Sequence, residues 1–158
     1  MKKSFHFDSD AGPYQADAAV VWCFDDRFTT AVRKFLKRRG ISRWDSIRLA
    51  GGAKSLASPG QESERAFVLD QIRLSCKLHG TSRLILLVHS DCGAYGGLAR
   101  FGGDAAAEME NHRAELARAA AAVLSAIPGV PVECFFADFQ GIWEVGQQPE
   151  TSRAAPGS

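Results

Sequence analysis

The sequence has no apolar run long enough to cross a bilayer, so we expect no membrane-spanning helix and no membrane partner. Two lysines near the start are not followed by the apolar segment of a secretory signal peptide. The formal net charge of +1 gives no reason to expect nucleic acid as a partner. We therefore predict a cytoplasmic protein, whose four cysteines serve metal binding or core packing rather than disulfide formation.

Internal repeats are also absent, and so is the Gly-x-x-x-x-Gly-Lys-Ser/Thr pattern of a phosphate-binding loop. The glycine-rich segment 93–97 lacks the required lysine, so nucleotide binding is not expected. The remaining composition, with 46% apolar and 23% charged residues, is that of a soluble globular protein. We predict a single α/β domain over residues 17–146, an N-terminal tail over 1–16 and a disordered C-terminal tail over 147–158.

Strand and helix signals alternate along the chain. Apolar or strand-forming runs predict strands at 18–23, 45–50, 83–88 and 130–139. Apolar residues at helical spacing predict helices from Phe28 to the stop at Gly40, at 61–79 and at 104–126. The segment 51–60 is rich in Gly, Ser and Pro and is predicted to be a loop.

This order of elements predicts an α/β fold. Strands that alternate with helices form a mostly parallel central sheet with right-handed crossovers, here of four strands with helices on both faces. The segment 141–145 is predicted to add a short edge strand. In such folds ligands bind outside the carboxyl ends of the strands.

Three metal-binding side chains follow two of these strands. Cys23 ends the first strand, and His89 and Cys92 come directly after the third. Carboxyl ends of parallel strands meet at one edge of the sheet, so these residues are expected to converge. Two thiolates and one imidazole suit Zn²⁺ and leave its fourth position for water or a carboxylate. The alternative, in which all three residues only pack in the core, is less favoured because three ligand types coincide at one edge.

Asp25 and Arg27 lie two and four residues after Cys23, on one side of the chain if strand geometry continues. Asp25 could orient a water on the metal while Arg27 keeps the carboxylate ionised, or Asp25 could bind the zinc itself and close the site. The plain alternative is a surface ion pair. Asp26 is predicted to be the N-cap of the helix that begins near Phe28.

The motifs Cys-x-Asp-x-Arg and His-x-x-Cys-Gly together resemble those of the β-class carbonic anhydrases, and the element order matches from Val20 to Val145. The segment 48–52 is similar to that family's Arg-Asn-Ala-Gly segment, with Leu49 in place of the asparagine. The resemblance implies three zinc ligands and a catalytic pair: Cys23, His89, Cys92, Asp25 and Arg27. It also implies about one Zn²⁺ per chain and a homodimer or higher homo-oligomer.

The reaction implied by the resemblance is reversible hydration of CO₂ to bicarbonate and a proton, with zinc-bound hydroxide as the nucleophile. Two alternatives stay open: a hydrolase of carbonyl sulfide or carbon disulfide on the same scaffold, and a non-catalytic homologue that binds zinc or bicarbonate. Besides Leu49, the chain is expected to depart from the family in an N-terminal helical arm that is absent or reduced and in the long 51–60 loop.

The remaining cysteines and histidines are interpreted as structural. Cys76 and Cys134 fall within a predicted helix and a predicted strand, where a free thiol packs as a small apolar group. His79 precedes Gly80 at a helix end, where partial positive charge is favourable. His112 is expected to be exposed on the helix 104–126.

Overall fold

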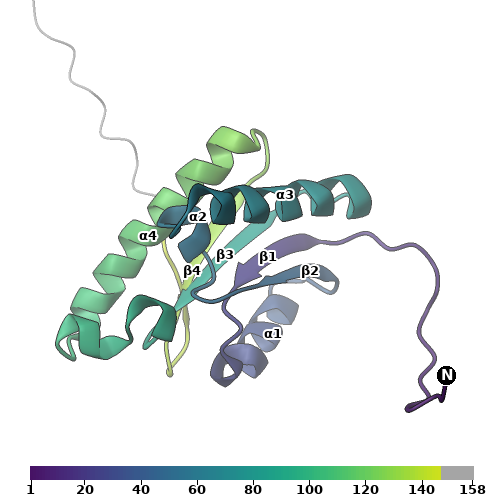
Figure 1. Ribbon diagram of the computed structural model, residues 1–158, viewed down its shortest axis with the longest axis horizontal. Coiled ribbons are helices and arrows are strands. Elements are labelled where there is room, and N and C mark those ends of the chain that lie inside the picture. The colour runs from purple at the N-terminus through teal and green to yellow at the C-terminus, as the bar shows by residue number, and fades with distance from the viewer. Residues whose placement is uncertain (147–158) are drawn as a thin grey trace, which may run out of the picture.

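A five-stranded sheet forms the centre of the computed structural model, which describes residues 1–146 (Figure 1). The strands are β1 (Ala18–Trp22), β2 (Trp44–Arg48), β3 (Leu84–His89), β4 (Val132–Ala137) and β5 (Ile142–Glu144). Their order in the sheet is β2-β1-β3-β4-β5. β1 to β4 are parallel and β5 pairs antiparallel with β4. The predicted α/β class, parallel sheet and edge strand are confirmed; the predicted tail 147–158 lies outside the described residues.

Helices cover both faces of the sheet, as predicted (Figure 1). They are α1 (Thr29–Arg38), α2 (Lys54–Ala57), α3 (Glu62–His79) and α4 (Ala105–Ala126), with short 3₁₀ turns η1 (Asp26–Phe28), η2 (Gly93–Tyr95) and η3 (Leu98–Phe101). On one face, Val32 and Leu36 of α1 pack against Val20 of β1. On the other, the helices α2, α3 and α4 pack against the opposite side of the same strands. Among residues 1–146, no helix combines the length and apolar character needed to cross a bilayer.

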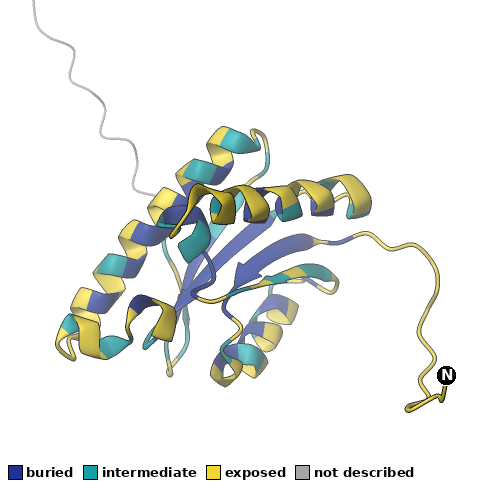
Figure 2. Ribbon diagram, in the orientation of Figure 1, coloured by how far each residue is buried: buried dark blue, intermediate teal, exposed yellow. Residues whose placement is uncertain are grey.

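β1 and β3 are buried along their whole length, because they lie inside the sheet with helices above and below (Figure 2). This burial explains why both read as continuous apolar runs rather than alternating ones. β2 lies at the edge and alternates between partly buried and exposed residues. The two central strands therefore fix where the residues that follow them must lie.

Two local predictions are corrected by the structure. The predicted loop 51–60 contains the four-residue helix α2, whose Leu56 and Ala57 are buried against α3 and α4. The N-cap is Asp25 rather than Asp26, because the Asp25 carboxylate accepts a hydrogen bond from the Arg27 backbone N–H at the start of η1. That change of one position places the Asp25 side chain beside the Arg27 side chain.

Candidate metal centre

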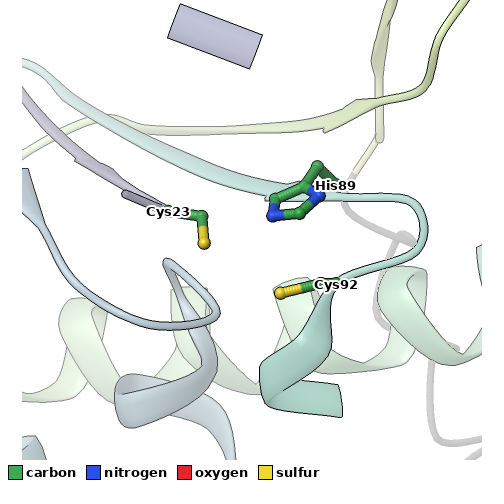
Figure 3. A group of neighbouring side chains, drawn as sticks. All are labelled: Cys23, His89 and Cys92. Atoms are coloured by element: carbon green, nitrogen blue, oxygen red, sulfur yellow. The ribbon is translucent and has the colours of Figure 1, made fainter. Parts of the chain in front are cut away.

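Cys23, His89 and Cys92 converge at the carboxyl edge of the sheet, as Figure 3 shows. Cys23 directly follows β1, His89 is the last residue of β3, and Cys92 precedes η2. Since β1 and β3 are neighbours in the sheet, the three possible ligand atoms lie within 4.8 Å of one another. All three residues are buried. The structure thus brings together a compact Cys₂His group that could hold a metal ion.

The imidazole of His89 is oriented for ligation through Nε2. Its Nδ1 lies 2.8 Å from the Ser90 carbonyl oxygen, which can only accept, so Nδ1 carries the proton and Nε2 is left as the acceptor. Nε2 is buried and has no hydrogen-bond partner within residues 1–146. The ring is also packed against Phe28, with ring centroids 4.6 Å apart. A buried acceptor without a donor, facing two thiols, fits a cation between them.

The two thiols lie within 4.8 Å of each other and do not ionise independently. The neighbouring Cys92 thiol lowers the pKa of the Cys23 thiol, and His89 and the backbone N–H groups of Asp25 and Gly51 act in the same direction. The negative charge on Cys23 and burial in turn raise the pKa of Cys92. Two thiolates this close repel each other unless a cation lies between them. The donor set therefore suits a metal ion with affinity for sulfur.

Asp25 and Arg27 form a tightly paired unit at the mouth of the cluster. Arg27 donates to both carboxylate oxygens of Asp25, from Nη2 at 2.6 Å and from Nε at 3.0 Å. These bonds hold the pKa of Asp25 at about 2, well below its ordinary value. Asp25 Oδ2 lies 3.9 Å from His89 Nε2, so the carboxylate borders the Cys₂His group.

Arg27 also connects the two loops that carry the site. Its Nη1 donates to Asp91 Oδ2 and its Nη2 to the Asp91 carbonyl oxygen, each at 3.1 Å. Asp91 lies between His89 and Cys92 in the chain, so the loop after β1 and the loop after β3 share one guanidinium. Both Asp25 and Asp91 raise the pKa of Arg27. The cation is therefore permanent at any physiological pH.

The cluster opens onto a cleft of about 720 Å³ at this edge of the sheet. The cleft is lined by site residues and glycines, among them Cys23, Asp25, Arg27, Gly51, Cys92 and Gly97. Glycine backbone approaches the site where a side chain would not fit. A Cβ on Gly52 would lie 2.2 Å from the Leu87 carbonyl oxygen and 3.1 Å from the Cys23 backbone nitrogen. The 51–52 turn is thus packed directly on the ends of β1 and β3.

Three polar residues on the buried face of α4 were not anticipated as part of this region. Glu108, His112 and Glu115 are 1%, 0% and 3% exposed, so the prediction of an exposed His112 is wrong. Their spacing of four and three residues puts them on one helix face, which is the signal that the sequence did contain. Glu108 accepts a hydrogen bond from the Asp91 backbone N–H, and Glu115 accepts one from the Tyr95 hydroxyl. The stripe therefore contacts the loop that follows β3.

His112 is expected to make stability depend on pH. Burial, with a smaller contribution from His89, lowers the pKa of His112 to about 4; Arg100 acts in the same direction and Glu115 opposes it. In the unfolded chain the pKa is about 6.5, so below that pH the unfolded state binds a proton that the folded state excludes. This contribution to stability is complete above about pH 6.5 and falls with pH towards 4, by about 2 kcal/mol between pH 7 and pH 5.

Urea unfolding at pH 7 and at pH 5 would measure this contribution of His112 to stability, with His112→Leu as the comparison. We expect the wild type to lose more stability than the variant by about this amount, because leucine has no proton to bind. Equal losses in the two proteins would show that His112 does not carry the pH dependence.

Comparisons with known proteins agree with this architecture. Residues 15–147 match the model of a family described as "Putative carbonic anhydrase". Solved structures of similar fold include a carbonic anhydrase from Streptococcus mutans, with a TM-score of 0.60, 20% identity and 88% of each chain covered. A β-carbonic anhydrase from Trichomonas vaginalis has a TM-score of 0.58 and 14% identity, covering 90% of this chain and 88% of its own.

Tetrameric β-carbonic anhydrases from Sordaria macrospora are similar as well, with a TM-score of 0.57 and 14% identity over 86% of this chain and 83% of theirs. No curated protein sequence matches the chain. At these identities the structural likeness shows the fold, whereas the family match spans most of the sequence and both halves of the Cys₂His group. The chain therefore belongs to this carbonic anhydrase family.

Proposed function

We propose that the protein is a zinc-dependent carbonic anhydrase that interconverts CO₂ and bicarbonate. The observation that carries the proposal is the buried Cys₂His group, whose open side faces a cleft beside a fixed carboxylate. Three protein ligands and a free fourth position are typical of catalytic rather than structural zinc. The family match supports the same reaction.

In this proposal Cys23, His89 and Cys92 hold the ion. When bound, Zn²⁺ lowers the pKa of a coordinated water to about 7, which supplies a nucleophile at neutral pH. Asp25, whose Oδ2 lies 3.9 Å from His89 Nε2, would accept a hydrogen bond from that water and orient it towards CO₂. Arg27 keeps Asp25 ionised and holds both of its oxygens, which supports the orienting role over direct ligation of the metal by Asp25.

We further propose that the protein acts as a homo-oligomer, at least a dimer, in the cytoplasm. The tetrameric Sordaria enzymes, which share the fold, support assembly. Light scattering coupled to gel filtration would measure the mass of the assembly directly, and a monomer at micromolar concentration would contradict this part of the proposal.

The test of function is a stopped-flow measurement of CO₂ hydration, made with the metal content of the same sample. We expect about one zinc per chain and hydration that disappears on chelation and returns with zinc. Carbonyl sulfide hydrolysis is measured in parallel. A fully zinc-loaded protein without CO₂ hydration at neutral or alkaline pH would contradict the proposal, and hydrolysis of carbonyl sulfide in that sample would indicate the related hydrolase.

Replacing Arg27 with methionine is expected to lower kcat/KM for CO₂ by about 10–100-fold with zinc still bound. The variant keeps an unbranched apolar stem but lacks the guanidinium, so it frees Asp25 and removes the hydrogen bonds between the two loops. Arg33→Met, on the exposed side of α1, is the matched control and should leave kcat/KM unchanged. Equal activity of the two variants would show that Arg27 does not position Asp25.

A further inference from the structure

A buried carboxylate on α4 contacts the turn between two of the proposed metal ligands. Glu108 is 1% exposed, and its Oε1 accepts a hydrogen bond of 2.7 Å from the Asp91 backbone N–H. The helix begins at Ala105 after the N-cap Asp104, so Glu108 lies in its first turn, and its side chain is buried. Burial raises the pKa of Glu108, so the position is costly for a carboxylate. The hydrogen bond from the Asp91 backbone N–H offsets part of this cost.

The backbone of Asp91, which Glu108 contacts, has an uncommon conformation. Asp91 has a φ of 52°, and within residues 1–146 no other non-glycine residue has a positive φ. This left-handed conformation reverses the chain after His89 and brings Cys92 back towards Cys23. This conformation is uncommon for a residue with a side chain, although aspartate tolerates it better than most, and neighbouring groups help to hold it. The hydrogen bond to Glu108 is one such restraint, and it acts on the backbone itself.

The side chain of Asp91 adds further hydrogen bonds that hold this loop. Its Oδ1 accepts from the Leu98 backbone N–H at 3.0 Å, which closes the loop that contains η2. Its Oδ2 accepts from Arg27, which in turn holds Asp25. Contacts therefore run from Glu108 through Asp91 to the Asp25–Arg27 pair on one side. On the other side they reach His89 and Cys92 through the backbone.

We propose that Glu108 is a positioning residue for the metal centre: by holding the Asp91 N–H it fixes the spacing of His89 and Cys92. This inference rests on the proposed function, because it requires that these two residues ligate a metal. It assigns Glu108 no contact with substrate or with the ion. What the position requires is a hydrogen-bond acceptor at the end of a side chain of this length.

Glutamine and methionine at position 108 distinguish the effect of the hydrogen-bond acceptor from the effect of side-chain size. Both approximate the length of glutamate, but only glutamine retains an oxygen. Each variant is loaded with Co²⁺, whose absorption bands report ligand geometry, and its zinc affinity is measured by chelator competition. We expect Glu108→Met to alter the Co²⁺ spectrum and weaken zinc binding about 10-fold or more. Glu108→Gln should restore both to near wild type. Glu110→Met, at an exposed glutamate of the same helix, should change neither.

A wild-type spectrum and affinity in Glu108→Met would overturn the positioning role, as would a Glu108→Gln variant as defective as the methionine one. Should the methionine variant not fold, hydrogen exchange of the Asp91 amide decides the question in the metal-free wild type. Slow exchange is expected for an N–H that donates to a buried carboxylate, and exchange as fast as in exposed loops would refute the contact. A wild type that binds neither zinc nor cobalt would instead refute the proposed function.

Discussion

Zinc content should fall from about one ion per chain to almost none when Cys92 is replaced with alanine. Zinc held by four protein ligands binds with about 10–16 kcal/mol, so one ligand is worth about 3–4 kcal/mol, or several hundred-fold in affinity. Cys92→Ala would leave only Cys23 and His89 of the three candidate ligands. CO₂ hydration should fall to the background rate. Metal analysis of protein purified without added zinc, followed by stopped-flow assay, measures both effects.

Cys134→Ala is the matched control for this substitution. Cys134 is also a buried thiol, 4% exposed, but it lies within β4 and its Sγ contacts the Leu116 carbonyl oxygen of α4. We expect this variant to keep its zinc and its activity and to lose only some stability through a small cavity. Full zinc content in Cys92→Ala, or loss of zinc in both variants, would contradict the assignment of Cys92 as a ligand.

Gly52→Ala is expected to lower the free energy of unfolding by about 3–4 kcal/mol. Two costs combine at this position. The φ of +58° is left-handed, which is unfavourable by about 1–2 kcal/mol for a residue with a Cβ. The Cβ would also lie 2.2 Å from the Leu87 carbonyl oxygen and close to the backbone at Cys23. Both neighbours belong to the central strands or follow them directly, so neither can move without disturbing the sheet.

Gly80→Ala separates these two costs. Gly80 ends α3 with a φ of +63°, nearly that of Gly52, but an added Cβ would meet nothing within 4 Å. Its loss of stability should therefore be only the conformational part, about 1–2 kcal/mol. Urea unfolding of both metal-free variants gives the difference. Equal losses at the two glycines would show that the close approach of the 51–52 turn to the strands carries no cost.

The parts of the fold that the sequence predicts well are those with a strong hydrophobic pattern. The run Leu84–Val88 has no polar residue, and such a continuous apolar run is typical of a strand that is buried on both faces. Once β1 and β3 are assigned as parallel neighbours, Cys23 and His89 must end at one edge, because a parallel ladder aligns carboxyl ends. Convergence of the metal-site residues was therefore predictable without coordinates.

The parts that could not be predicted depend on contacts between distant segments. Ala occurs on every side of α4, so the hydrophobic pattern does not show which face is buried and does not predict that His112 faces the core. The short helix α2 forms within a Gly/Ser/Pro-rich segment because Leu56 finds a buried position against α3 and α4, not because of local propensity. The left-handed Asp91 has no sequence signature apart from the tolerance of aspartate for that conformation.

The two loops that carry the Cys₂His group are adjacent in the fold but distant in the sequence. The segment from Cys23 to His89 contains α1, β2, α2 and α3, yet its two ends meet at the Cys₂His group. An ion held there would join the ends of this long loop as a disulfide does, and a covalent cross-link of such a loop is worth about 4 kcal/mol in chain entropy. Metal supply would then set how long each molecule resists unfolding and proteolysis, as well as whether it can react.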